Sequence, residues 1–427
     1  MTRPRYSAPL RVSVVCGDHG RAQYICNALK RAQLDARVGE FTEPCDVFLF
    51  DLSTCRPALV TEISRYAKEC SASPPLIATL GAVGSLIEPI QNVDVRLSSD
   101  SAISLANARF HFARRTAARR AEVKLRKESY ERFGFTHSPN DTQCKSNILY
   151  VGEACGRFLA LKGHLESQEF NISAAFSTHT AFDFLHDHSF SAILLDTSAD
   201  RINPDNFCAM VRRSSNLVDI PILALADEKQ EFGPDILDCV TDLIDTNSTL
   251  DNVSDQLTEL IQNRGPSTKD FAAPNKEITD AATGLFTRAF FENHLEHQIE
   301  WSLNYNQALT LLIIKVEAFP GKDVDPRDLS ITARVVKNLL RVQDAPTRLD
   351  WSTLAVSMPG ADEISAKNAA RRLEGVLDAT AFEGELGQPA RQIRINWHIS
   401  ELNPDQSPEQ LLSSALKNTP KSGYAAA

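Results

Sequence analysis

Short apolar runs alternate with helical patterns over much of the chain. Near the N-terminus the runs fall at Arg11–Cys16, Asp46–Asp51 and Pro75–Leu80. Further along they fall at Asn147–Val151, Ser191–Asp196, Ile220–Leu225 and Thr241–Asp245. Apolar strands separated by helices indicate βαβ units around a parallel sheet. The pattern therefore predicts two α/β domains, over residues 8–128 and 145–263.

The remaining chain predicts a linker and a third domain. Residues 264–277 combine proline, glycine, serine and charged residues, a composition typical of a flexible connector. From residue 278 to residue 427, helical patterns mix with apolar runs at Leu309–Val316 and Thr353–Met358. This mixture indicates a further α/β fold, so we expect two similar domains, a linker and a third domain.

Composition limits the class of protein to which these domains can belong. Of the 427 residues, 43% are hydrophobic and 23% are charged, a globular balance that can fill several cores. The net charge of −10 argues against a nucleic-acid-binding protein. No apolar run is long enough to span a membrane, and nine cysteines stand singly without a CxxC pair. We therefore expect a cytoplasmic protein without a membrane span, a metal site or a disulfide framework.

One stretch departs from the acidic average. Residues 109–127 hold eight basic side chains and a single acid, Glu122. Such a run could contact an acidic partner or a phosphate-rich ligand, or it could be the solvated face of the helix that ends the first domain. We favour the solvated helix face, because charge runs usually face water.

The two N-terminal domains each place an aspartate, Asp51 or Asp196, at the end of an apolar strand. Together with the repeated strand and helix pattern, this resembles the response-regulator receiver family, in which that aspartate accepts a phosphoryl group. The resemblance implies CheY-like doubly wound domains with their sites at the carboxyl edge of the sheet. Asp51 and Asp196 are therefore the candidate phosphoacceptors.

Most partners that phosphorylation needs in this family are missing at both aspartates. The positions of the acidic pair that would hold Mg²⁺ fall on Cys16 and Gly17 in the first domain, and on Gly152 and Glu153 in the second. The lysine positions fall near Ser98 and Thr246, and Ala226 replaces the hydroxyl in the second domain. We therefore favour structural or dimerising pseudo-receivers, and an active phosphorelay protein remains the alternative.

The third domain opens with a specific signature. Residues 280–291 read D-A-A-T-G-L-F-T-R-A-F-F. This run resembles the opening signature of the GGDEF family, roughly D-x-L-T-G-L-x-N-R-x-x-F, and the resemblance covers nearly the whole third domain. It implies the nucleotidyl-cyclase-like α/β fold of the diguanylate cyclases, which make cyclic di-GMP.

The positions that hold metal in an active cyclase carry other residues here. The D-x-D-x-F strand end corresponds to residues 315–319, which read K-V-E-A-F, so Lys315 replaces a carboxylate. The GGDEF turn corresponds to Asp350, Trp351, Ser352 and Thr353. The guanine-reading asparagine corresponds to Asp323. Because an ammonium repels a divalent cation and two hydroxyls replace the acids, we expect no catalytic residues, no metal and no enzyme activity.

One binding element of the family is retained. Arg341 and Asp344 form an R-x-x-D motif that ends five residues before the altered turn, the spacing of the family's inhibitory site for cyclic di-GMP. A guanidinium can fork onto phosphate oxygens or the guanine Hoogsteen edge, and a carboxylate accepts from guanine N–H groups. In the family a second arginine assists, and Arg372 or Arg371 is the candidate. The alternative is a surface ion pair of little consequence.

The whole layout resembles receiver–receiver–GGDEF proteins of the PleD type and, with its altered turn, PopA-like cyclic di-GMP effectors. The resemblance implies a homodimeric signalling adaptor at a cell pole, with cyclic di-GMP as its ligand and no other cofactor. Such an adaptor recruits proteolysis adaptors and protease substrates during the cell cycle. A residual diguanylate cyclase and a phosphorelay response regulator are the alternatives.

Overall fold

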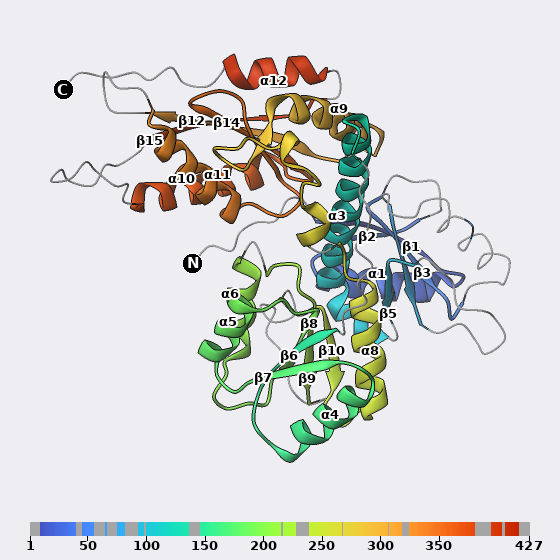
Figure 1. Cartoon of the computed structure of the whole chain (residues 1–427). Helices are drawn as coiled ribbons and strands as arrows, with labels where there is room; N and C mark the ends of the chain where they lie inside the picture. Colours follow the sequence, from blue (N-terminus) through green and yellow to red (C-terminus); the bar gives the residue numbers. More distant parts are fainter. Residues whose placement is uncertain are drawn as a thin grey trace, which may run out of the picture. The chain divides into compact units, whose positions relative to one another are not determined.

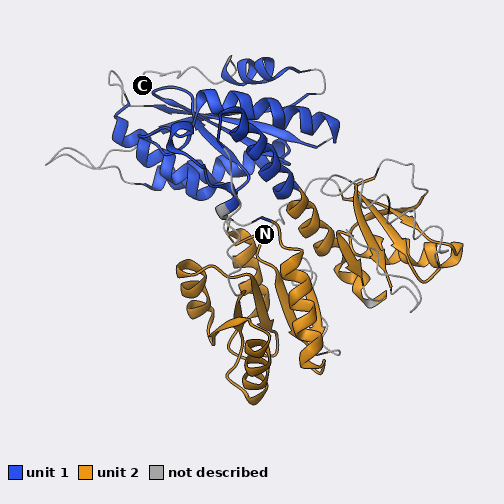
Figure 2. Cartoon of the chain, turned by 45° about the vertical axis from the view of Figure 1, so that its right-hand side comes forward, with its two compact units in different colours: residues 1–7, 118–139, 266–427 blue, residues 8–117, 140–265 orange. Residues whose placement is uncertain are grey.

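The computed structural model describes residues 9–39, 45–54, 65, 75–81, 93–97, 100–135, 146–214, 217–227, 239–266, 268–305, 307–317, 324–380, 394–403 and 406–417. The chain forms two compact units, shown in separate colours in Figure 2. We call residues 8–117 with 140–265 the N-terminal unit, and residues 1–7, 118–139 and 266–427 the C-terminal unit. Within the described ranges, no helix is long and apolar enough to cross a membrane.

The N-terminal unit begins with a five-stranded parallel sheet in the order β2-β1-β3-β4-β5. Its strands are β1 (Arg11–Val15), β2 (Asp35–Val38), β3 (Val47–Asp51), β4 (Leu76–Leu80) and β5 (Val95–Leu97). Helix α1 (His19–Arg31) follows β1, because the Asp18 carboxylate accepts the Arg21 N–H and so caps its first turn. This strand order is that of the flavodoxin-like doubly wound fold. The parallel α/β prediction for this region is confirmed.

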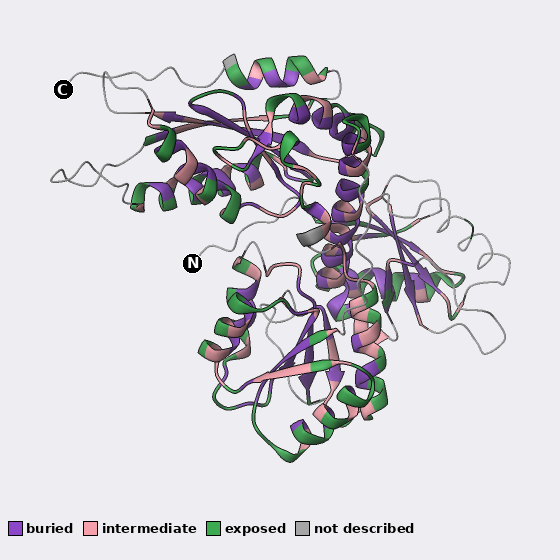
Figure 3. Cartoon of the chain, viewed as in Figure 1, coloured by how far each residue is buried: buried purple, intermediate pink, exposed green. Residues whose placement is uncertain are grey.

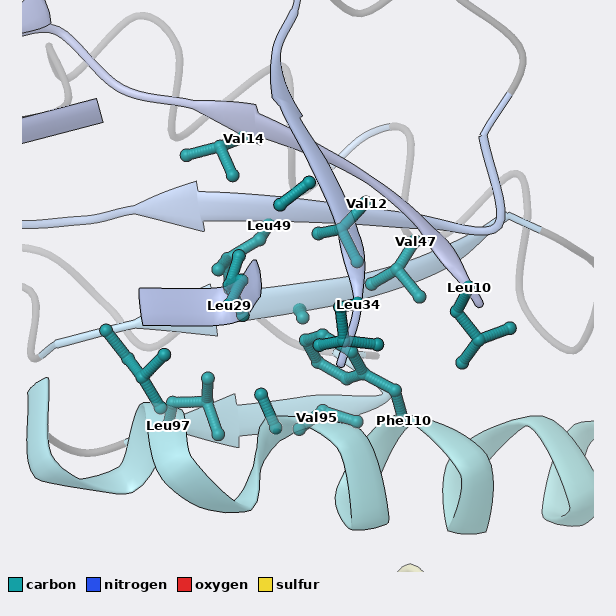
Figure 4. Packing of buried hydrophobic residues seen from close by; sticks show 14 of the residues in the cluster. Leu10, Val12, Val14, Leu29, Leu34, Val47, Leu49, Val95, Leu97 and Phe110 are labelled. Carbon is teal, nitrogen blue, oxygen red and sulfur yellow. The ribbon is translucent and has the colours of Figure 1, made fainter. Parts of the chain in front are cut away.

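A helix that follows the first sheet closes its core. A 3₁₀ turn (Asp100–Leu105) leads into α3 (Ala106–Arg132), labelled in Figure 1. Phe110 of α3 points toward the sheet in Figure 4, and its side chain is buried in one apolar cluster with Val12, Leu34 and Leu49. The first half of α3 is therefore held by burial of its apolar side chains.

A second parallel sheet in the N-terminal unit has the order β7-β6-β8-β9-β10. Its strands are β6 (Asn147–Val151), β7 (Asn171–Ala175), β8 (Ala192–Asp196), β9 (Ile222–Ala226) and β10 (Asp242–Asp245). Helices α5 (Thr178–Asp187) and α6 (Pro204–Arg213) share one apolar cluster with the sheet, and α4 (Gly156–Ser167) and α8 (Leu250–Gln262) share the other. Both faces are covered, as the continuous apolar strands predict.

The C-terminal unit contains a mixed sheet in the order β11-β13-β14-β12-β15. Its strands are β11 (Phe286–Thr287), β12 (Leu309–Glu317), β13 (Ala345–Arg348), β14 (Thr353–Pro359) and β15 (Arg394–Glu401). The pair β11–β13 is parallel and the other pairs are antiparallel. Alternate residues of β12 enter two apolar clusters, one with α10 (Pro326–Leu339) and α11 (Glu363–Ala379), the other with α9 (Arg288–Asn304) and α12 (Pro408–Lys417).

The domain boundary that we expect at residue 128 falls inside helix α3. Helix α3 runs unbroken to Arg132, and its residues from 118 onward group with the C-terminal unit. There Tyr130 stacks on Phe290 of α9 with ring centroids 5.4 Å apart. The expected linker, residues 264–277, contains the 3₁₀ turn Thr268–Phe271 and the first two residues of another turn, Lys276–Ile278, and Phe271 is buried.

The solvated-face interpretation of residues 109–127 is wrong for the second half of that stretch. Arg119, Glu122 and Arg126 are only 5%, 1% and 2% exposed, and Figure 3 shows buried colour along this part of α3. These charges are matched inside the C-terminal unit, since Arg126 donates to Glu122 over 2.7 Å. The pattern of polar and apolar residues along the helix does not reveal this burial, because the residues that cover these side chains lie far along the chain.

Candidate functional site

The R-x-x-D motif forms a tight turn between α10 and β13, which we call the R-x-x-D turn (residues 341–344). The Asp344 N–H donates to the Arg341 carbonyl over 3.1 Å. In return, the Asp344 carboxylate accepts the Arg341 backbone N–H over 2.9 Å. The aspartate is thus fixed by its own turn, as short acidic side chains often are.

The second carboxylate oxygen of Asp344 is in an unusual position. The residue is 3% exposed, and its Oδ1 atom has no hydrogen-bond partner among the described residues. Burial raises the pKa of Asp344 to about 6, against the opposing effects of Arg341 and Arg126. A buried carboxylate with an unsatisfied oxygen costs stability, so a further hydrogen bond to this oxygen would offset part of that cost.

Two arginines lie beside this carboxylate. Arg341 is half-buried, and no hydrogen bond from its guanidinium is found within the described ranges. Arg372 of α11 donates to the Leu339 carbonyl over 2.7 Å, and burial and the neighbouring Arg341 lower its pKa. Both arginines are exposed, but of the two candidates on α11 only Arg372 has such a contact near the turn among the described residues. Two cations and one acid form a site that suits an anion bearing hydrogen-bond donors.

The hairpin that corresponds to the GGDEF turn is closed by its own side chains. The Asp350 carboxylate accepts the backbone N–H groups of Ser352 and Thr353, each over 2.8 Å. Ser352 and Thr353 are buried, whereas Trp351 projects outward and is 58% exposed. The Asp350 carboxylate therefore stabilises the hairpin itself, and the backbone N–H groups of Ser352 and Thr353 already have an acceptor.

Lys315 of β12 lies next to this hairpin. In the sheet register Lys315 pairs with Thr353 on one side and with Asn396 on the other. The nearby Glu317 accepts from the Asn396 amide over 2.6 Å. An ammonium and two hydroxyls therefore occupy the strand edge, and the described residues contain no group of three His, Cys, Asp or Glu side chains that could hold a metal. Asp323 and residues 318–319 lie outside the described residues.

The opening signature forms a structured loop beside the hairpin. Asp280 accepts the Thr283 N–H over 2.9 Å and pairs with Arg348 over 3.0 Å. Hydrogen bonds from Thr283 and the pairing with Arg348 outweigh burial and lower the pKa of Asp280. Gly284 has a φ of 66°, which a side chain would strain, so the glycine of the signature is needed here.

In the first receiver-like domain, Asp51 is engaged by a cation that the sequence pattern did not single out. Asp51 is fully buried, and Arg21 of α1 contacts both of its oxygens over 2.7 and 3.1 Å. Ser53 and Thr54 donate to the same carboxylate. These hydrogen bonds outweigh burial and lower the pKa of Asp51. A guanidinium from the same domain thus neutralises Asp51. Ser98 lies outside the described residues.

In the second receiver-like domain, a tyrosine hydroxyl contacts the candidate phosphoacceptor. The Tyr150 hydroxyl donates to Asp196 over 3.0 Å, and Ser198 donates to the other carboxylate oxygen through its N–H and its hydroxyl. A Cβ at Gly152 would lie 2.5 Å from the Tyr150 hydroxyl, so only glycine fits beside it. Burial and Asp196 raise the pKa of Tyr150. Both candidate phosphoacceptors are therefore enclosed by side chains of their own domains.

Comparisons with known proteins place the C-terminal part of the chain. Residues 277–422 match the family model described as diguanylate cyclase, GGDEF domain. These residues form a GGDEF domain. A search of curated proteins finds no match for the chain.

Solved structures give more distant likenesses. The GGDEF domain of DgcB from Caulobacter crescentus, in complex with c-di-GMP, is 13% identical over 34% of this chain and 87% of its own, with a TM-score of 0.32. The FimX GGDEF domain from Pseudomonas aeruginosa is 18% identical over 33% and 90%, with a TM-score of 0.30. A signal receiver domain of a histidine kinase from Syntrophus aciditrophicus is 19% identical over 27% and 90%, with a TM-score of 0.25.

Proposed function

We propose that this chain binds cyclic di-GMP through Arg341, Asp344 and Arg372 and does not synthesise it. The observation that carries the proposal is the contrast within one GGDEF domain. The R-x-x-D turn keeps an uncommitted guanidinium and an unsatisfied carboxylate oxygen, whereas the hairpin and strand that serve catalysis present Lys315 and buried hydroxyls. Guanine offers N–H donors and phosphates offer oxygens, which match this set of groups.

In this proposal the two N-terminal domains are pseudo-receivers. Arg21 at Asp51 and Tyr150 at Asp196 donate to the carboxylate oxygens that a metal ion would coordinate and a phosphoryl group would join. The chain then acts as a ligand-gated signalling adaptor, a PopA-like homodimeric effector that recruits proteolysis adaptors and protease substrates at a cell pole. The last step rests on the family resemblance of the layout alone.

Two other functions make different predictions. A weak diguanylate cyclase would convert GTP in a Mg²⁺-dependent manner, which the side chains at Lys315 and Ser352 oppose. A phosphorelay response regulator would carry a stable phosphoryl group on Asp51, which the Arg21 ion pair opposes. No observation among the described residues favours either of these functions over the adaptor.

The proposal is tested by two assays on one preparation of the full chain. Calorimetry with cyclic di-GMP should give saturable binding in the micromolar range or tighter. Incubation with GTP and Mg²⁺ or Mn²⁺, followed by chromatography, should give no cyclic di-GMP. Binding without synthesis supports the proposal, whereas synthesis supports the cyclase, and the absence of both leaves a scaffold without nucleotide function.

A further inference from the structure

A buried arginine of α3 donates hydrogen bonds to the backbone of the R-x-x-D turn. Arg126 is 2% exposed, and its Nη2 atom donates to the carbonyls of Gln343 and Asp344 over 3.1 and 3.0 Å. Its Nη1 atom donates to the Phe271 carbonyl over 3.1 Å. One guanidinium thereby joins three segments of the C-terminal unit, namely α3, residues 268–271 and the R-x-x-D turn.

The position of Arg126 is fixed independently of the turn. Its Nε atom donates to Glu122 one helical turn earlier, and Glu122 accepts from His294 and Gln298 of α9, each over 2.8 Å. The rings of Phe271 and Phe286 lie 5.1 and 5.5 Å from the guanidinium carbon. The Arg126 guanidinium therefore has a paired charge, hydrogen-bond acceptors and two aromatic rings around it, and these contacts hold it in one geometry.

We propose that Arg126 is a positioning residue for the ligand site, so that cyclic di-GMP binding is coupled to the packing of α3 residues 118–132 on the GGDEF domain. The inference rests on the proposed function. Fixing two consecutive carbonyls fixes the peptide planes on either side of Asp344, and with them the direction of its side chain. A turn arranged before binding loses less entropy when the ligand arrives. By reciprocity, bound ligand must stabilise the packing of α3 by the same free energy.

The charges around Asp344 give this role a signature in pH. Arg341 of the turn and Arg126 of α3 lower the pKa of Asp344, Glu122 of α3 raises it, and Arg372 of α11 also lies near it. Since the ionised carboxylate is the form that accepts from guanine, binding should weaken as pH falls through about 6. Loss of the Arg126 charge should move that weakening to higher pH.

The experiment measures cyclic di-GMP affinity of the full chain from about pH 5 to about pH 8 for wild type and three variants. Arg126→Met should lose roughly tenfold or more in affinity for cyclic di-GMP. It should also raise the acid midpoint, which is the pH at which binding is half lost on acidification. Arg126→Lys keeps the charge but cannot fork, so it should lose affinity with the midpoint retained. The matched control is Arg119→Met, because Arg119 is also buried on α3 and donates to a carbonyl, that of Pro266, away from the turn.

The control should lower the melting temperature while leaving affinity and midpoint unchanged. If Arg126→Met or, should that variant not fold, Arg126→Lys behaves as Arg119→Met does, Arg126 is merely structural and the inference is overturned. If wild type does not bind at all, the proposed function fails first. Hydrogen exchange adds a second readout, since saturating ligand should slow exchange of α3 amides 118–132 in wild type and not in Arg126→Met.

Discussion

Replacement of Asp344 by asparagine should stabilise the protein while abolishing its ligand affinity. Asparagine is nearly the same size and its amide oxygen can still accept the Arg341 N–H. It removes a carboxylate that is 3% exposed and has one oxygen without a partner among the described residues. A residue kept only for the turn should not cost stability, whereas a ligand-binding residue can.

The magnitude follows from the pKa of Asp344, which is about 6 against an ordinary value of 3.8. The protonated form stabilises the fold, and that contribution is complete below about pH 4 and is lost as pH rises through about 6. Above that range the ionised group costs up to about 3 kcal/mol. Asp344→Asn should therefore gain about 3 kcal/mol near pH 7.5 and only about 0.5 kcal/mol near pH 4.

The assay is urea unfolding of both proteins at several pH values, followed by a probe of the GGDEF domain such as fluorescence of its tryptophans. The matched control is Asp280→Asn, because hydrogen bonds from Thr283 and the pairing with Arg348 lower the pKa of Asp280. That control should lose stability at neutral pH, and its loss should shrink as pH falls through the lowered pKa. A loss of stability at pH 7.5 in Asp344→Asn, or a gain that does not depend on pH, would refute the reasoning.

Two further predictions concern the enclosed aspartates Asp51 and Asp196, and a third concerns the packing of α3. Arg21→Met should destabilise the N-terminal unit by about 3 kcal/mol in urea unfolding, because it leaves Asp51 buried without its cation; an unchanged midpoint would contradict this. Tyr150→Phe should cost about 1 to 2 kcal/mol in the same assay, because Asp196 loses a hydrogen bond, and acetyl phosphate should still fail to label Asp196. Phe271→Ala should cost about 3 kcal/mol and speed proteolysis within α3, and equal proteolysis rates would argue against the packing described here.

Apolar patterning predicted the strands well, because a strand buried on both faces must be apolar at every position. The run Ile220–Leu225 became β9 at Ile222–Ala226, and Thr353–Met358 became β14 with one residue more. The R-x-x-D turn was also located from sequence, since Arg341 and Asp344 are three positions apart and interact locally. Its neighbour Arg372 lies on α11, the next helix along the chain.

The residues that sequence reasoning missed act over long separations. Arg126 meets the R-x-x-D turn from more than two hundred positions away, and nothing in its neighbourhood distinguishes it from the other basic residues of α3. Arg21 reaches Asp51 across the carboxyl edge of the sheet in the same way. One indirect indication of Arg21 was present in the sequence. Because Cys16 and Gly17 replace the acids that would hold a metal ion, a cationic side chain had to neutralise the buried aspartate instead.

The measurement that tests the account most directly is a calorimetric titration of cyclic di-GMP into wild type, Arg341→Ala and Arg334→Ala. Arg334 is the control, because it lies on the exposed side of α10, which leads into the turn. The account predicts that wild type and Arg334→Ala bind alike and that Arg341→Ala loses measurable affinity. Equal binding by all three proteins would show that the nucleotide, if held at all, is held elsewhere on the chain.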